Sequence, residues 1–299
     1  MLFLILHIAG NAAFLLLVRL GRSARFDYYT VGVANYATAA LLSIPLLLAA
    51  DLPTYSLVAA VLGAVNGFQY LSTYFFMYVL IGLAGIAITS GFLRLSVAVP
   101  VFASMLIWHE WPSPLQAVGL VLAGFALPLM GSRSKHRRVA GKALEVEQSA
   151  VSIAALIATT ILISGSGLLA AKAFTELQQP EQRPLYTAAV YTTATLLGLA
   201  AWPWRHRFRP PPSLIIHHSS LTTSLGLGAL VGVVNIGQLL ALLPALSLVP
   251  GVIAFPLSSA GGLALATLGA WIFWREPLGG RTGAGIVLAI AAAALVNAA

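Results

Sequence analysis

The sequence predicts an all-α polytopic membrane protein whose ten transmembrane helices form two inverted five-helix repeats. First, 59% of its 299 residues are hydrophobic and only 8% are charged, whereas soluble globular domains carry about 25% charged residues. Second, long intervals without charged residues recur along the chain at lengths that suit membrane crossings. Third, the two halves of the chain resemble each other. This composition excludes a soluble enzyme, a nucleic-acid reader and a disordered chain.

Six intervals without Asp, Glu, Lys or Arg each accommodate one crossing of about 20 residues. They are residues 1–18, 28–50, 111–132, 149–171, 184–204 and 282–299. No basic segment precedes the first interval, so we expect it to be a spanning helix and not a cleaved signal peptide.

Two longer intervals each predict a pair of crossings. Residues 221–274 carry no charge and are interrupted by prolines, and residues 52–109 contain a single charged residue, Arg94. The ten predicted helices are 1–20, 28–50, 55–79, 84–108, 113–131, 149–174, 184–204, 221–246, 251–274 and 280–298.

Basic residues predict the orientation of these helices. Thirteen of the 16 Lys and Arg residues fall at helix ends and loops on one side, whereas the other side holds only Lys172 and Arg183. Because cytoplasmic loops are enriched in Lys and Arg, we expect residues 132–148 in the cytoplasm and both termini outside. The expected location is a plasma membrane of the bacterial inner-membrane type.

Metal and cofactor sites are not expected. The chain has no cysteine, which excludes disulfides and thiolate metal sites. The pair His217-His218 has no acidic residue nearby, and no glycine-rich segment continues into the Lys-Ser/Thr of a phosphate-binding loop.

Three blocks of the first half recur in the second half in the same order. Residues 63–69 match residues 232–238 at an offset of 169. Gly85, Trp108, Glu110 and Gly119 match residues 166 positions later, and the first hairpins match at an offset of 155, as in Gly10 and Gly165.

The repeats predict a first half over residues 1–131, a basic linker over 132–148 and a second half over 149–299. Since each half has an odd number of helices, the second is inverted relative to the first. Inverted repeats with a site near the midplane are typical of secondary transporters that work by alternating access. The alternative is a duplicated scaffold that moves nothing.

Each half contains an apolar helix that ends in an aromatic residue and Glu, followed by a short turn and a glycine-bearing helix. The two segments are residues 105–119, Met-Leu-Ile-Trp-His-Glu-Trp-Pro-Ser-Pro-Leu-Gln-Ala-Val-Gly, and 271–283, Trp-Ile-Phe-Trp-Arg-Glu-Pro-Leu-Gly-Gly-Arg-Thr-Gly. With ten helices in two inverted fives, the chain resembles the EamA-type branch of the drug/metabolite transporter superfamily along nearly its whole length. It departs from that family where His109 and Arg275 replace the customary Gly before Glu. The resemblance implies a transporter and no particular substrate.

Arg94 is the strongest candidate for substrate binding. It lies ten residues into a predicted crossing, with Ser90 one turn before it on the same face. A charged residue within a span costs at least about 2.5–3.5 kcal/mol on insertion scales and therefore indicates a function. A guanidinium that faces a cavity binds a carboxylate or phosphate. The alternative is a structural Arg that donates to carbonyls of a neighbouring helix.

Amide side chains are further candidates. Asn66 and Gln69 share one helical face, which Thr73 extends, and Asn235 and Gln238 repeat the pair. Amides both donate and accept hydrogen bonds and suit a polar solute. Hydrogen bonding between helices is the competing interpretation.

Four more residues complete the predicted site. His7 and Asn11 share a face of the first helix, and His7 is either a protonatable coupling residue or, as we favour, a packing residue. Tyr36 and Tyr74, like Tyr70, line the cavity or pack against neighbours. Glu110 and Glu276 are expected to be interface anchors or gate contacts.

Taken together, these residues predict a secondary transporter or exchanger of a small polar metabolite that is anionic or zwitterionic. The alternatives are an exporter of drugs or amphipathic compounds, which would require a membrane-embedded carboxylate, and a passive channel or scaffold. An intramembrane enzyme is not expected, because all eight acidic residues fall at span ends or in loops. The expected partners are the solute and the lipid bilayer, without nucleic acid, and the protein is expected to be a monomer or homodimer.

Overall fold

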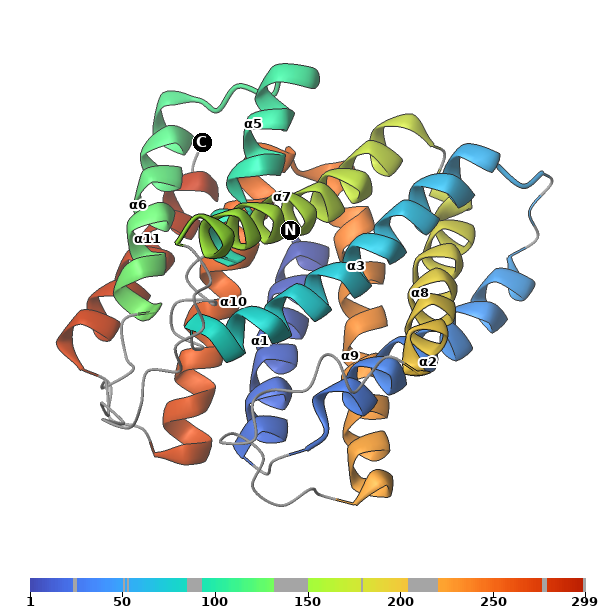
Figure 1. Ribbon diagram of the computed structural model, residues 1–299. Helices are drawn as coiled ribbons and strands as arrows, with labels where there is room; N and C mark the ends of the chain where they lie inside the picture. Colours follow the sequence, from blue (N-terminus) through green and yellow to red (C-terminus); the bar gives the residue numbers. More distant parts are fainter. Residues whose placement is uncertain are drawn as a thin grey trace.

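The computed structural model describes residues 1–23, 26–50, 52, 54–84, 93–131, 150–178, 180–203, 220–275 and 279–297. These residues are almost entirely helical, and no strand occurs among them (Figure 1). Its ten α-helices are α1 (Leu2–Ser23), α2 (Tyr28–Ala49), α3 (Leu57–Ala84), α5 (Ala98–Ile107), α6 (Pro114–Gly131), α7 (Ala150–Leu177), α8 (Arg183–Ala200), α9 (Leu221–Leu248), α10 (Gly251–Trp274) and α11 (Gly280–Asn297), with a 3₁₀ helix η1 (Pro180–Gln182) before α8. The predicted all-α fold class is confirmed for these residues.

Nine of the ten predicted helices coincide with one observed helix each, to within five residues at either end. The described part of the remaining one, 84–108, is an apolar segment, Leu93–Ile107, which turns at residues 96–97 before α5 begins. The predicted linker 132–148 lies outside the described residues. So do Ser90 and Glu276.

Among the residues that the structure describes, five helical segments are long and apolar enough to cross a membrane. They are Leu2–Gly21, Tyr28–Ala49, Ala155–Leu177, Leu221–Leu248 and Gly251–Trp274. Large apolar side chains such as Leu48, Leu106 and Phe273 are highly exposed on the outer faces of the helices. Exposed apolar faces of this kind are compatible with an integral membrane protein, because lipid replaces water around them.

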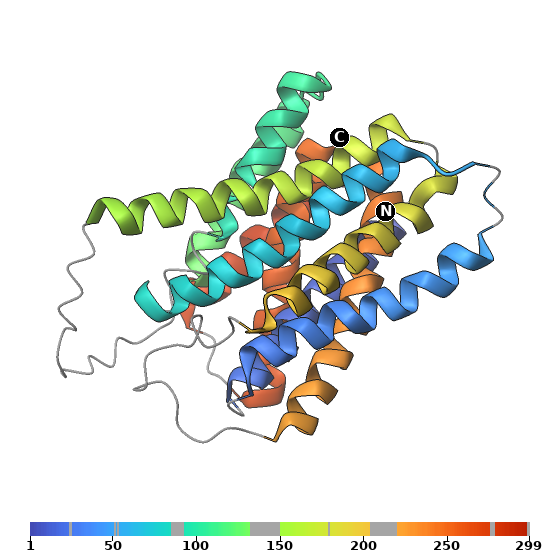
Figure 2. The same cartoon turned by 45° about the vertical axis from the view of Figure 1, so that its right-hand side comes forward.

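Four helices, α7, α3, α8 and α2, lie side by side and run nearly parallel (Figure 2). In the rest of the structure, α1 packs between α9 and α10, and α6 packs along α11 at the left of Figure 1. Helices of the first half thus pack mainly on helices of the second half. The third helix of each half, α3 or α9, contacts the first two helices of the other half.

Glycines allow the closest of these helix contacts. A Cβ atom added to Gly63 or Gly67 of α3 would lie 2.6 or 2.2 Å from a carbonyl oxygen of α8. On α9, a Cβ at Gly228 or Gly232 would lie 2.7 or 2.4 Å from a carbonyl oxygen of α2. Small residues that bring helix backbones together are the usual basis of packing in membranes.

Two residues other than glycine adopt the left-handed backbone conformation in the described part of the chain. His109, after α5, has φ of 54°, and Arg275, after α10, has φ of 52°. Glycine is the residue that this conformation favours at helix C-termini. In the sequence, each of these two residues is followed by Glu.

Candidate functional site

The two amide side chains of α3 face helices of the second half. Asn66 is fully buried, and its Nδ2 donates to the hydroxyl of Tyr186 on α8 at 2.7 Å. Gln69 Nε2 donates to Ser166 Oγ on α7, also at 2.7 Å. The oxygen atoms of both amides are buried and have no hydrogen-bond partner.

The amides of α9 have different partners. Asn235 Nδ2 donates to Asn35 Oδ1 on α2 at 3.1 Å, and its backbone oxygen accepts a bond of 2.8 Å from the hydroxyl of Tyr191. The backbone oxygen of Gln238 lies 2.9 Å from Nδ1 of His7. Because a carbonyl oxygen can only accept, His7 Nδ1 carries a hydrogen here, and the imidazole links α1 to α9.

Several tyrosine rings of α2, α3 and α8 pack against one another. Tyr74 stacks on Tyr28 with centroids 4.3 Å apart and meets Tyr36 edge to face at 6.1 Å. Tyr70 and Tyr191 also meet edge to face, at 6.3 Å. Tyr36 donates to the backbone oxygen of Tyr70 at 3.0 Å, and Tyr74 donates to that of Tyr28 at 2.6 Å. Both Tyr36 and Tyr74 are buried in the interior.

Arg94 lies just before α5, and its side chain is half-buried. Its backbone oxygen accepts a hydrogen bond from Val97, and the part of the chain that the structure describes provides no partner for its guanidinium. Arg94 is therefore not satisfied by carbonyls of a described neighbouring helix.

Two other candidates lie elsewhere in the bundle. Thr73 is half-buried, and Asn11 packs against Gly262 of α10, where an added Cβ would lie 2.9 Å from the Asn11 amide.

An ion-pair cluster that sequence reasoning missed joins α5, α7 and α10. The ammonium group of Lys172 lies 2.5 Å from Glu110 Oε1 and 2.5 Å from Glu176 Oε1. Its side chain is only 1% exposed, compared with 15% for Glu110 and 35% for Glu176. The Lys172 nitrogen also lies 5.8 Å from the centre of the Trp108 ring, within the range of a cation–π contact.

The second oxygen of Glu110 caps α10. It accepts hydrogen bonds from the backbone N–H groups of Gly251 at 2.6 Å and Val252 at 3.3 Å. These are the first two residues of α10, where unpaired N–H groups and the helix dipole favour a carboxylate. Glu110 therefore connects the end of α5 in the first half to α7 and α10 in the second half.

The distribution of Lys and Arg predicts that Lys172 lies on the non-cytoplasmic side, but it does not predict an ion-pair partner for this residue. One signal for the ion pair was available, because Lys172 and Glu176 are four residues apart at the end of an otherwise charge-free helix. The pairing with Glu110, 62 residues earlier, had no local signal.

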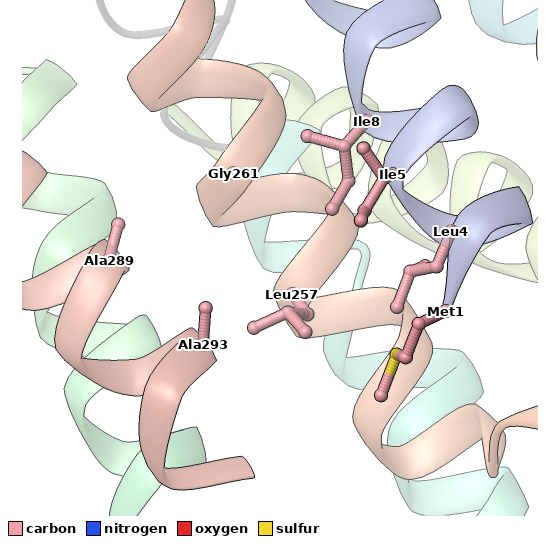
Figure 3. Close-up of a pocket in the computed structure, with 8 residues that line it drawn as sticks. All are labelled: Met1, Leu4, Ile5, Ile8, Leu257, Gly261, Ala289 and Ala293. Atoms are coloured by element: carbon pink, nitrogen blue, oxygen red, sulfur yellow. The ribbon is translucent and has the colours of Figure 1, made fainter. Parts of the chain in front are cut away.

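Two grooves on the surface are lined mainly by apolar residues. One, of about 250 Å³, lies between α1 and the pair α10 and α11 (Figure 3). Its lining residues are Met1, Leu4, Ile5, Ile8, Leu257, Gly261, Ala289 and Ala293. The other, of about 530 Å³, runs between α1 and α9 and includes Gln238. None of the charged candidates lines either groove. Within the described residues, no three His, Cys, Asp or Glu side chains come together as metal ligands would.

No family model and no curated protein matches this chain. The chain is similar to a solved structure described as "Crystal structure of protein", with a TM-score of 0.71 and 16% sequence identity. The similarity covers 99% of this chain and 96% of that one. It shows that a solved protein shares the fold over the whole length.

Proposed function

We propose that this protein is a secondary transporter or exchanger that moves a small anionic or zwitterionic metabolite by alternating access. We propose further that its two halves are inverted repeats, as in the EamA-type transporters that the sequence resembles. It would act in a plasma membrane of the bacterial type, with both termini outside.

The observation that carries this proposal is the reciprocal packing of the two halves. The third helix of the first half, α3, packs on α7 and α8, and the third helix of the second half, α9, packs on α1 and α2. The second helices pack on each other, as do the fourth and the fifth helices. A two-fold axis that exchanges the halves would produce this pattern, and such an axis is the basis of alternating access in repeat-built transporters.

Matching contacts support the same relation at residue level. Gly63 approaches the backbone oxygen of Tyr186, and Gly228 approaches that of Val31. The two glycines are 165 residues apart in the sequence, and the two residues that they approach are 155 residues apart. The second offset equals the one found for the first hairpins in the sequence.

Two tyrosine hydrogen bonds obey these offsets. Tyr36 donates to the backbone oxygen of Tyr70, and Tyr191 donates to that of Asn235. The contacts therefore match Asn235 with Tyr70. The sequence comparison, with its offset of 169 residues, pairs Asn235 with Asn66 instead. The two alignments of α3 with α9 therefore differ by four residues, which is about one helical turn.

The chemistry of binding would depend on Arg94. Its guanidinium, which has no partner among the described residues, offers a planar set of donors to a carboxylate or phosphate, in a segment of low polarity where such a bond is strong. The cluster around Lys172 would hold one end of the bundle closed, because it joins α5 of one half to α7 and α10 of the other. Movement of one half against the other would have to break these bonds.

Flux measurements on the purified protein in proteoliposomes test the proposal. Vesicles loaded with one member of a metabolite panel should exchange it for an external labelled copy, and Arg94→Ala should abolish this exchange without lowering the melting temperature. If the protein is folded and neither anionic nor zwitterionic solutes exchange faster than in protein-free vesicles, the proposed transport function is wrong. If Arg94→Ala exchanges the solute normally, the proposed role of Arg94 is wrong but the transport function is not contradicted.

A further inference from the structure

Two cation–π contacts lie near opposite ends of α10. Lys172 Nζ lies 5.8 Å from the centre of the Trp108 ring, and Arg19 Cζ lies 4.9 Å from that of Trp274. Glu110, two residues after Trp108, accepts a hydrogen bond from the first residue of α10, whereas Trp274 is the last residue of this helix. The 24 residues of α10 extend about 36 Å, enough to cross a hydrocarbon core of about 30 Å. The two contacts therefore belong to opposite ends of the bundle.

Each contact joins the two halves in the same way. A cation near the end of the first helix of one half lies against the tryptophan at the end of the fourth helix of the other half. Lys172 follows Arg19 by 153 residues, and Trp274 follows Trp108 by 166 residues. The residue after each tryptophan has the left-handed backbone conformation, with φ of 54° in one case and 52° in the other.

A second pair of contacts between the same helices has the same two offsets. Ser164 Oγ of α7 lies 3.2 Å from the hydroxyl of Ser96, just before α5. Asn11 of α1 packs against Gly262 of α10, where an added Cβ would lie 2.9 Å from the Asn11 amide. The residues on α1 and α7 are 153 positions apart, and their two partners are 166 positions apart. Exchange of the two halves in this register therefore makes the two tryptophan contacts equivalent.

We propose that the contact of Arg19 with Trp274 is a gate contact that holds its end of the bundle closed, as the cluster around Lys172 does at the other end. A cation on the face of an indole ring is attracted to it, and this attraction is lost once the two helices separate. Both contacts are present in this structure, so the two halves are joined at both ends. Opening of one end would break one contact and leave the other in place. This inference rests on the proposed transport function and assigns a gate at the end that the distribution of Lys and Arg predicts to be cytoplasmic.

Distances between spin labels at each end of the bundle test the proposal. Because the chain has no native cysteine, introduced cysteines are labelled specifically. Labels on Leu115→Cys and Glu181→Cys report on the end at which α10 begins. Labels on Leu20→Cys and Gly280→Cys report on the end at which α10 terminates. All four positions are exposed, and pulsed electron paramagnetic resonance in lipid nanodiscs would measure both pairs.

Trp274→Leu removes the aromatic face and keeps an apolar side chain. We expect the ratio of long to short distances between positions 20 and 280 to rise at least about fivefold, the effect of one cation–π contact, and the ratio between positions 115 and 181 not to rise. Trp271→Leu, about one turn earlier on α10 and exposed, is the matched control and should change neither ratio. If Trp274→Leu has no more effect than this control, or lengthens both pairs alike, the inference is wrong.

Trp274→Phe distinguishes cation binding from packing, and it keeps the test decisive if Trp274→Leu lowers the melting temperature. Phenylalanine still offers an aromatic face to a cation, so this variant should stay mostly closed between positions 20 and 280. Equal opening in the leucine and phenylalanine variants would show that packing alone closes this end, which would overturn the inference.

Flux in proteoliposomes separates the gate contact from the transport function. If a solute is exchanged but Trp274→Leu leaves the distance between positions 20 and 280 unchanged, the gate contact is wrong and transport stands. If the distances respond as expected but no solute of the metabolite panel is exchanged, the gate contact stands and transport is wrong.

Discussion

Lys172 can remain charged in the interior because two carboxylates and an indole ring surround its ammonium group. Desolvation of a charge costs several kcal/mol, which close partners offset only while all of them are in place. Glu110 is shared between this lysine and the first N–H groups of α10. Loss of Lys172 would therefore leave a partly buried carboxylate with only backbone donors.

We predict that Lys172→Met destabilises the protein by about 3 kcal/mol. The double variant Lys172→Met/Glu110→Gln should cost less than the sum of the two single variants, because the second change removes the unpaired charge. Thermal unfolding in detergent measures both effects. Additive losses would show that the two residues are not coupled.

His109 and Arg275 hold a backbone conformation that costs a residue with a Cβ atom about 1–2 kcal/mol. We predict that His109→Gly and Arg275→Gly each stabilise the protein by about 1 kcal/mol, because glycine adopts this conformation without strain. Ala103→Gly, within α5, is the control and should destabilise by a similar amount. If the first two variants lower the melting temperature as Ala103→Gly does, contacts of the replaced side chains outweigh the backbone strain.

Among the helices, the pairs α3 with α8 and α9 with α2 depend on glycines at the point of contact. Gly228 and Gly226 lie two residues apart on α9 but face different surroundings. A Cβ at Gly228 would lie 2.5 Å from Ala34 Cβ, whereas a Cβ at Gly226 would meet nothing within 4 Å.

We predict that Gly228→Ala destabilises the protein by about 1–3 kcal/mol, because α9 must move away from α2. Gly226→Ala should be neutral or slightly stabilising, since alanine favours the helix. Melting temperatures of both variants, measured side by side, test the difference. Equal effects of the two changes would mean that the helices do not pack closely at Gly228.

The sequence was sufficient to predict nearly every helix, because charge-free intervals end where charged and polar residues begin. It was not sufficient for the register between the halves. Both α3 and α9 consist mostly of small and apolar residues, so their sequences can be aligned in more than one register. Aligning the similar segments 63–69 and 232–238 gives a register one helical turn away from the one that the helix contacts give. Nor could it show that Asn35 would pair with Asn235, because such a contact forms only after the helices pack.

At the scale of the whole molecule, two connections between helices test the predicted orientation in the membrane. The connection between α7 and α8 contains Glu181, and the one between α10 and α11 precedes Gly280. The distribution of Lys and Arg predicts that the first of these faces outside and the second faces the cytoplasm.

We predict that Glu181→Cys reacts with a membrane-impermeant thiol reagent in intact cells and that Gly280→Cys reacts only after permeabilisation. Both positions are exposed, and an added Cβ at Gly280 meets nothing within 4 Å. The chain has no native cysteine to remove first. The reverse labelling pattern would show that the protein sits in the membrane the other way round.

The bonds of Glu110 also have a consequence for biosynthesis. The ribosome adds Glu110 before Lys172 and well before Gly251, with which it pairs 141 positions later. Until α10 has been inserted, this carboxylate lacks the helix end that it caps, and α6 lacks its partner α11 until that helix has been made. The first five helices would therefore wait in the bilayer as an incomplete intermediate until α10 and α11 have been inserted beside them.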